Sequence, residues 1–443
     1  MSATSKTGRA ALVAANGRAR RPAEPPQGDF SHAAAQRDRE RRDMFWFGNA
    51  PEGWSVGKMR SVVYERREKF SRNEELIILS LLKDVGVIPY SEKGEIGNKS
   101  KEDHSQYKVA RKGDLVINSM NVIIGSVGIS PYDGYISPAY YSFVPREDTC
   151  MGYIGYLCST RRFQRAVRCY AKGIMEIRLR VSSYDFLSMP IPLPPLPEQK
   201  AIVAYLDAET GRLDKAIAAE EKMIALLQER REIVINEAVA PHDGWEVRRL
   251  GTIGEFSKGG GISRDDLQES GLPAILYGDI YTKYNHAVVE VKNHISDRTA
   301  KGAVSVEYGD ILMTGSGETK EDIGKAVAFL GDSSFIGGDV ICFRQKDHNS
   351  CYLSYALNSE AAKAFRYRES KGEIVVHIYA SSLKQLPIPL PPLPEQEAIV
   401  ERLDRETGKI DRAIEVKRRQ IELLRERRQI VIDEVVTGKV KVA

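Results

Sequence analysis

Two long segments of the chain carry apolar residues with a seven-residue period. When Val203 and Leu206 are taken as heptad positions a and d, eight of the eleven a and d positions in residues 203–238 are apolar, and the same register gives eight of eleven in residues 400–435. Heptads sustained over about five repeats predict a coiled coil. The alternative is a long helix packed only on its own domain. The residues expected at this interface are Leu206, Leu213, Ile217, Glu220, Ile224, Leu227, Leu403, Ile410, Ile414, Lys417, Ile421 and Leu424.

The polar residues inside the heptads favour one orientation of the two helices. A parallel pair in register would place Arg231 against Arg428, a clash of like charges. An antiparallel pair brings Arg231 level with Thr407 and places Glu220 near Lys417. Opposite charges at a central core position fix the register of a coiled coil. We therefore predict an intramolecular antiparallel pair, which sets the distance between two globular parts related by an approximate two-fold axis.

A proline-rich string precedes each helical segment. "PIPLPPLPEQ" begins at Pro190 and again at Pro387, and residues 190–239 share 32 of 50 identities with residues 387–436. Proline fixes φ and cannot donate a backbone hydrogen bond, so the string is expected to be extended, and the helix should start near its last proline. The string is a helix entrance that the chain uses twice.

The sequence around the repeats reads as mixed β and α. "KGDLVINS" from Lys112 resembles "YGDILMTG" from Tyr308, and each shows a turn followed by a short apolar run, as expected for a strand. The predicted fold is α+β, with two mixed β/α domains joined by the antiparallel coiled coil in a pseudo-two-fold arrangement. The expected parts are a tail (1–43), a first globular domain (45–189), an entrance and helix (190–240), a second globular domain (241–386) and a second entrance and helix (387–443).

Composition changes this picture in few places. Residues 1–43 hold nine Lys and Arg against five acids, which accounts for the whole formal charge of +4. We interpret them as a disordered basic arm, in preference to a transit peptide that they faintly resemble. The five cysteines form no CxxC pair, and no apolar stretch approaches the ~20 residues of a membrane span. A cytoplasmic protein without contact to membranes is expected.

The sequence lacks the motifs of a catalytic centre. It contains no GxxxxGK[ST] loop, HExxH, GxSxG, adenine-methylation motif or nuclease cluster, and its seven histidines are scattered. Polar side chains in the loops of the globular domains instead suit hydrogen bonding to base edges and phosphates. The predicted DNA-facing residues are Asn118, Ser119, Asn121 and Tyr140 in the first domain and Arg264, Tyr277, Thr314, Ser316 and Lys320 in the second. No metal site is expected.

The doubled "PLPPLPEQ.AIV..LD.ETG..D", followed by "LL.ERR..I", resembles the specificity subunit of type I restriction-modification systems. "GSVGISPYDGYISPAY" from Gly125 is similar to that family's first-domain pattern. The resemblance implies two target-recognition domains that each read one half of a bipartite site in double-stranded DNA. It also implies that the paired helices set the gap and dock two methyltransferase subunits, which restriction and translocase subunits join. S-adenosylmethionine, Mg²⁺ and ATP would then be used by those partners, with no cofactor on this chain and no enzymatic activity of its own.

Three alternatives remain. The least favoured is an enzyme with an unrecognised site, which methylation or cleavage by the isolated chain would support. A DNA-binding regulator would pair a coiled coil with DNA readers, although it would ordinarily dimerise through the coil. A protein adaptor could use the helices without any DNA. Purification with or without a methyltransferase chain separates the adaptor from the first function.

Overall fold

The computed structural model describes residues 46–71, 74–83, 85–94, 104–173 and 179–442. The predicted tail in residues 1–43 lies outside them. The chain divides into two compact units: among the described residues, unit 1 comprises residues 46–213 and 426–442, and unit 2 comprises residues 214–425. Each unit contains one globular part and segments of both long helices. No helix among the described residues has both the length and the apolar character needed to cross a membrane.

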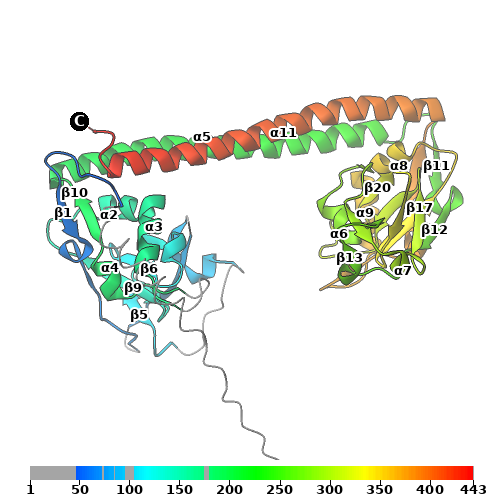
Figure 1. Cartoon of the computed structure of the whole chain (residues 1–443). Coiled ribbons are helices and arrows are strands. Elements are labelled where there is room, and N and C mark those ends of the chain that lie inside the picture. The colour runs from blue at the N-terminus through cyan, green and yellow to red at the C-terminus, as the bar shows by residue number, and fades with distance from the viewer. Residues whose placement is uncertain (1–45, 72–73, 84, 95–103, 174–178, 443) are drawn as a thin grey trace, which may run out of the picture. The chain divides into compact units, whose positions relative to one another are not determined.

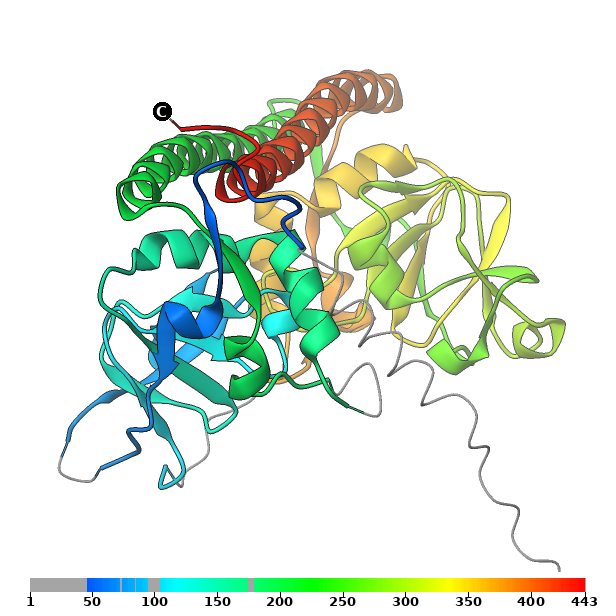
Figure 2. The same cartoon turned by 60° about the vertical axis from the view of Figure 1, so that its left-hand side comes forward.

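Two long helices, α5 (Leu196–Val239) and α11 (Leu393–Val436), run side by side in opposite directions (Figures 1 and 2). In unit 1, the first turns of α5 share a core with the last turns of α11, through Leu206 and Ile432. In unit 2, the last turns of α5 share a core with the first turns of α11, through Ile235 and Leu403. The predicted antiparallel pairing is therefore confirmed.

The predicted heptad positions are the less exposed positions of both helices. Every a and d position of both helices is buried or half-buried, including all twelve residues expected at the interface. Glu220 and Lys417 pair with 2.9 Å between Oε2 and Nζ. Near this pair, Arg425 donates to Glu221 Oε1 at 2.9 Å. Because both pairs remain partly exposed, they contribute little to stability and act mainly on register.

The proline-rich helix entrances form short strands, each of which pairs with the first strand of its globular part. In unit 1, β10 (Pro190–Leu193) pairs antiparallel with β1 (Ser55–Lys58). In unit 2, β24 (Pro387–Leu390) pairs in the same way with β11 (Glu246–Arg249). The buried side chains of Gln199 and Gln396 donate to the carbonyls of Pro194 and Pro391, each at 2.8 Å. The repeated glutamine thus holds the end of the proline string against the first helical turn.

The globular part of unit 1 contains two sheets, with strand orders β2-β9-β6-β7 and β4-β3-β8-β5. Their strands are β2 (Val63–Glu65), β3 (Ile77–Leu82), β4 (Gly86–Pro89), β5 (Lys108–Ala110), β6 (Leu115–Asn118), β7 (Val127–Ile129), β8 (Gly134–Ile136) and β9 (Tyr140–Pro145), and the helices are α2 (Met151–Ser159), α3 (Arg161–Tyr170) and α4 (Ser183–Leu187). Leu115 and Ile117 pack on the helices, whereas Val116 packs between the sheets. Strand β6 is thus buried on both faces, which explains its continuous apolar run.

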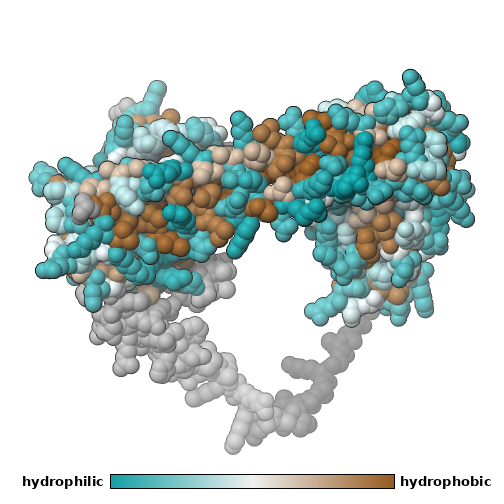
Figure 3. Space-filling view, turned by 90° about the horizontal axis from the view of Figure 1, so that it is seen from above, coloured by the Kyte–Doolittle hydropathy of each residue, from teal (hydrophilic) through white to brown (hydrophobic). Residues whose placement is uncertain are grey.

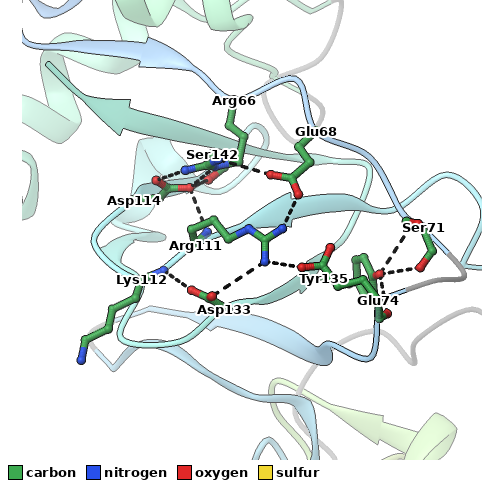
Figure 4. A network of polar contacts seen from close by, with 10 residues as sticks. All are labelled: Arg66, Glu68, Ser71, Glu74, Arg111, Lys112, Asp114, Asp133, Tyr135 and Ser142. Atoms are coloured by element: carbon green, nitrogen blue, oxygen red, sulfur yellow. Dashed lines mark hydrogen bonds and ion pairs between the residues drawn. The ribbon is translucent and has the colours of Figure 1, made fainter.

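A network of ion pairs links the two sheets of unit 1 (Figure 4). Asp114 accepts from Arg66 Nε at 2.6 Å, from Arg66 Nη2 at 3.0 Å and from the Ser142 hydroxyl at 2.7 Å. The guanidinium of Arg111 reaches Glu74 at 2.6 Å and also pairs with Glu68, and these two carboxylates raise the pKa of Arg111 above its ordinary value. Because Asp114 is buried, its charge needs these partners.

The globular part of unit 2 has sheets ordered β12-β22-β18-β20-β15 and β13-β16-β14-β21-β17, with a short β19-β23 pair. The strands are β12 (Glu255–Lys258), β13 (Leu267–Gln268), β14 (Leu272–Ile275), β15 (Ala287–Val288), β16 (Asn293–Ile295), β17 (Val304–Glu307), β18 (Ile311–Thr314), β19 (Ser316–Gly317), β20 (Ala326–Phe329), β21 (Ser333–Ile336), β22 (Val340–Arg344) and β23 (Val376–His377). The helices are α6 (Tyr277–Thr282), α7 (Asp297–Ala300), α8 (Ser350–Leu357), α9 (Glu360–Glu369) and α10 (Ala380–Leu383).

The two globular parts share one topology. The order β2-β9-β6-β7 in unit 1 corresponds to β12-β22-β18-β20 in unit 2, and in both units a parallel pair, β3-β8 or β14-β21, lies in the second sheet. Asp310 precedes β18 as Asp114 precedes β6, and it binds Arg344 through two hydrogen bonds of 2.8 and 2.6 Å. The weak sequence echoes between the two halves therefore mark equivalent strands. The predicted α+β fold is confirmed.

Candidate nucleic-acid interface

Three segments of unit 1 converge at the end of strand β6. The backbone N–H of Ser119 donates to the carbonyl of Ala139 at 3.1 Å, and the N–H of Val181 donates to the carbonyl of Ser119 at 2.8 Å. Together they border a cavity of about 300 Å³, whose lining includes Tyr141 and Lys172. A loop, a strand start and the segment after α3 are thus held together by backbone bonds, although they are far apart in sequence.

The predicted DNA-facing residues of unit 1 differ in exposure. Asn118 is buried, and its Oδ1 accepts from the N–H of Met120 at 3.1 Å and of Asn121 at 3.4 Å. It therefore shapes the loop. Ser119 is buried beside the cavity, whereas Asn121 is exposed. Tyr140 is half-buried, and burial raises its pKa above the ordinary value.

Cationic side chains that the sequence did not single out lie in the same region. Lys108 donates to the carbonyl of Tyr140 at 2.6 Å, and its Nζ lies 4.1 Å from the centre of the Tyr141 ring. Burial lowers the pKa of this lysine. Lys172 and Arg180 form a β-bridge and line the cavity. A ring and cations beside a polar loop suit base stacking and phosphate contact.

Helix α3, which leads into Lys172, is strongly basic. It contains Arg161, Arg162, Arg165 and Arg168 and no acidic residue. Arg162 pairs with Asp433 at 2.7 Å, while Arg161 and Arg165 are exposed. The local run of arginines in the sequence could have identified this basic helix, although the net charge of the chain outside the tail is zero. Such a run supplies the local charge that phosphate binding requires.

Unit 2 repeats this convergence at the end of strand β18. The N–H of Gly315 donates to the carbonyl of Asp339 at 2.7 Å, and the N–H of Ile378 donates to the carbonyl of Gly315 at 3.0 Å. Gly315 thus occupies the place that Ser119 has in unit 1. A cavity of about 1160 Å³ lies beside it and is lined by two residues predicted to face DNA, Arg264 and Tyr277.

Two of the residues predicted to contact DNA in unit 2 lie inside the protein. Thr314 is fully buried and donates to the Tyr281 hydroxyl at 2.7 Å, and Ser316 is buried with its hydroxyl 2.9 Å from His377 Nδ1. Their hydroxyls therefore hold neighbouring rings and do not reach the surface, which corrects the expectation for both. Lys320 is half-buried, with its Nζ 6.0 Å from the centre of the Tyr367 ring.

Helix α5 borders this cavity with Arg231, which contacts His286. Arg231 Nη2 lies 3.0 Å from His286 Nε2, and the His286 ring lies 4.2 Å from the Tyr355 ring, centre to centre. Burial lowers the pKa of His286 to about 3, and the charges of Arg231, Lys325 and Lys363 act in the same direction. The imidazole is therefore neutral in the folded protein at neutral pH.

Acidification is expected to destabilise unit 2 through His286. Its folded pKa lies below the ordinary value of 6.5, so its stabilising contribution is present above about pH 6.5 and is lost as the pH falls toward 3. Between pH 7 and pH 4 we expect a loss of about 3 kcal/mol in the free energy of unfolding from this group. Urea unfolding at both pH values measures the loss. His286→Gln should remove that part of the pH dependence, and the exposed His242→Gln should leave it in place; equal slopes for the two variants would contradict the assignment.

No group of His, Cys, Asp and Glu side chains within the described residues is arranged to hold a metal ion. The cysteines of the chain, all within the described residues, are free thiols. Burial raises the pKa of Cys158 and Cys342, which leaves these thiols protonated and unreactive.

Comparison with known proteins agrees with this chemistry. A family model described as type I restriction modification DNA specificity domain matches residues 51–228 and 242–424. The chain is 24% identical over 399 residues to the StySPI specificity subunit of a type I restriction enzyme from Salmonella potsdam, covering 81% of this chain and 82% of the relative. It is also 24% identical to the putative MjaX specificity subunit from Methanocaldococcus jannaschii, covering 89% and 95%. A solved chain from work on complex assembly and conformational transition of the type I R-M system has a TM-score of 0.69 at 19% identity, covering 88% of this chain and all of that one.

Proposed function

This chain belongs to the family of type I restriction-modification DNA specificity domains, and from that premise we propose how its parts divide the work. The chain recognises DNA sequence within a restriction-modification complex and is not itself the enzyme. Unit 1 reads one half of a bipartite double-stranded site and unit 2 reads the other. The helix pair sets the number of unread base pairs between the halves.

The observation that carries this proposal is the repeated convergence beside Ser119 and Gly315. The same backbone bonds join a loop, a strand start and the segment after a helix in both units. The side chains around these bonds differ: a β-bridge joins Lys172 to Arg180 in unit 1 and Lys371 to His377 in unit 2, and the cavity of unit 2 is also lined by Arg264 and Tyr277. A common frame with different side chains is what two readers of different half-sites require.

The chemistry would then belong to partner subunits. Methyltransferase subunits would bind S-adenosylmethionine, and restriction and translocase subunits would use Mg²⁺ and ATP, so this chain would hold no cofactor. A role on chromosomal and incoming DNA also places the protein in the cytoplasm. The experiment is to express the chain with its methyltransferase subunits and to map the methylated adenines in genomic DNA. Methylation at a motif of two constant parts separated by a constant gap supports the proposal, and methylation without such a motif contradicts it.

The outer surface of the helices offers two equivalent places for a partner. Leu226 and Ile233 on α5 and Val416, Leu423 and Ile430 on α11 are 40 to 57% exposed and recur every seven residues. Leu226 and Leu423 are separated by the repeat length of 197 residues, as are Ile233 and Ile430. Hydrophobic side chains gather along the helices on the face shown in Figure 3. Two matching apolar stripes support docking of two copies of one methyltransferase subunit.

A charge placed in one stripe is expected to remove one methyltransferase copy. Leu226→Lys should weaken binding at the α5 stripe by about 100-fold, because a central apolar anchor becomes a desolvated charge. Leu423→Lys should do the same at the α11 stripe, and the double variant should bind neither copy. Native mass spectrometry of the assembled complex counts the copies. Ala225→Lys, at the exposed neighbouring position, is the matched control; loss of both copies from a single variant would contradict two independent stripes.

A further inference from the structure

The tract "LD.ET" occurs in both helices, yet heptad packing does not explain its polar residues. Asp207 and Thr210 in α5 correspond to Asp404 and Thr407 in α11. Both threonines are buried. Their hydroxyls donate to the carbonyls four residues earlier, Leu206 O and Leu403 O, each at 2.7 Å. The aspartates lie one residue after the apolar d positions and are exposed to solvent on one side.

A tyrosine from each globular part binds this tract. In unit 1, Tyr156 of α2 donates to Asp207 Oδ1 at 2.6 Å, and its hydroxyl lies 3.3 Å from Thr210 Oγ1. Burial, together with the bond to Asp207, raises the pKa of Tyr156 to about 12. The hydroxyl therefore stays protonated at neutral pH and donates its hydrogen bond to Asp207.

Unit 2 contains the same arrangement. Tyr355 of α8 donates to Asp404 Oδ1 at 2.7 Å and also hydrogen-bonds with Thr407. Burial raises its pKa above the ordinary value. The two tyrosines come from equivalent helices, so both globular parts make the same contact with the long helices.

The opposite helix adds a cation to each group. Arg428 of α11 is close enough to Tyr156 to oppose the rise of its pKa, and Arg231 of α5 does the same for Tyr355. Arg231 also lies 3.5 Å from Asp411 Oδ1. Each group, here called a latch, joins one globular part to a long helix through hydrogen bonds. The latches consist of Tyr156, Asp207 and Thr210 in unit 1 and of Tyr355, Asp404 and Thr407 in unit 2.

The latches differ in kind from the packing around them. The globular part of unit 1 also meets the helices through apolar side chains such as Ile154, Leu206 and Val435, through the Arg162–Asp433 pair at 2.7 Å and through the bond from Trp54 Nε1 to Glu198 at 2.9 Å. Apolar packing is non-directional and tolerates small rotations, whereas a bond of 2.6 to 2.7 Å to a carboxylate constrains both distance and angle. The latch therefore contributes a directional constraint on the angle at which a globular part is attached to the helices.

We propose that Tyr156 and Tyr355 are positioning residues that restrict the chain to one gap length between its half-sites. The proposal rests on the function proposed above, in which the helices set the gap. Adjacent base pairs are rotated by roughly 35° about the duplex axis. A reading domain held at a fixed angle therefore accepts one gap, and a domain free to rotate by a similar amount accepts the neighbouring gaps as well.

The test compares gap preference in complexes of the full chain with its methyltransferase subunits. Tyr156→Phe, Tyr355→Phe and the double variant keep the rings and remove only the hydroxyls. Duplexes carry the natural half-sites with the natural gap, one base pair fewer or one more. For each single variant we expect the preference for the natural gap to fall by about tenfold, the lower end of the equilibrium factor of one hydrogen bond to a charged group. The double variant should lose more, and base preference inside the half-sites should stay unchanged.

Controls separate this role from simple stabilisation. Tyr184→Phe and Tyr308→Phe change rings that are 70 and 71% exposed and should keep the wild-type gap preference. Asp207→Asn with Asp404→Asn retains an acceptor without its charge and should give an intermediate loss, and thermal unfolding verifies that each variant is folded. Folded tyrosine variants with unchanged gap preference, or with equal loss at every gap, would overturn the proposal. A wild-type complex without any fixed gap would instead overturn the proposed function.

Discussion

Deleting residues 214–220 and 411–417 together is expected to shorten the gap in the recognised DNA site by roughly one to three base pairs. One heptad removed from each helix shortens the pair by ~10 Å at ~1.5 Å per residue, and one base pair spans ~3.4 Å of duplex. The deletion preserves the heptad register and removes both members of the Glu220–Lys417 pair. It leaves Thr210 and Thr407 in place, so both latches remain.

The measurement is the gap in the methylation motif of the deleted variant, assembled with methyltransferase subunits. The bases read on either side should not change. Activity is expected to fall, because removing base pairs also rotates one half-site relative to the other. Deleting residues 214–220 alone is the control: it leaves Lys417 facing a shifted helix, and it should lower stability without giving a new gap. An active double deletion that keeps the natural gap would show that helix length does not determine it.

Exchanging residues 45–189 for the same domain of another family member is expected to replace one half of the recognised sequence and to leave the other half unchanged. The exchanged range contains β1 and ends just before β10, which pairs with β1, so the two ends of the domain lie side by side and the donor's first strand must pair with the retained β10. The methylation motif of the chimera provides the measurement. The reciprocal exchange of residues 241–386 should alter the other half.

The contacts of unit 1 also define which donors suit the exchange. Tyr153 donates to the carbonyls of Pro192 at 2.9 Å and Val436 at 3.2 Å, and Tyr156 reaches Asp207. A donor domain with tyrosines at both positions should fold on the helices of this chain. A chimera that is folded and active but changes both halves of its motif would contradict independent reading by the two units.

The helices were predictable from the sequence because their pattern is long and local. Heptads place Glu220 and Lys417 at core positions, and the repulsion between Arg231 and Arg428 excludes one of the two orientations. The strands at Leu115 and Ile311 were also predictable, since a glycine–aspartate turn before an apolar run is a local signal.

The recognition surfaces were less predictable because they form between distant segments. Lys108, Tyr141 and Lys172 meet only after the sheet has formed, and no local pattern connects them. Thr314 and Ser316 were predicted at the surface but are buried. The composition of a polar loop is the same whether its hydroxyls face solvent or a buried ring. Tyr281 and His377, which take up these hydroxyls, lie more than 30 residues away in sequence.

The division of the helices between the units has a consequence for synthesis on the ribosome. Unit 2 is one continuous stretch, residues 214–425, whereas the core of unit 1 includes Ile432, Val435 and Val436 from the end of α11. At about 5–20 residues per second, the last segment of unit 1 follows the first by about 10 to 40 s. During that interval the apolar side chains that later meet α11 have no native partner. This interval, in which only the first part of unit 1 has been made, is therefore the stage at which chaperone binding and aggregation compete with folding.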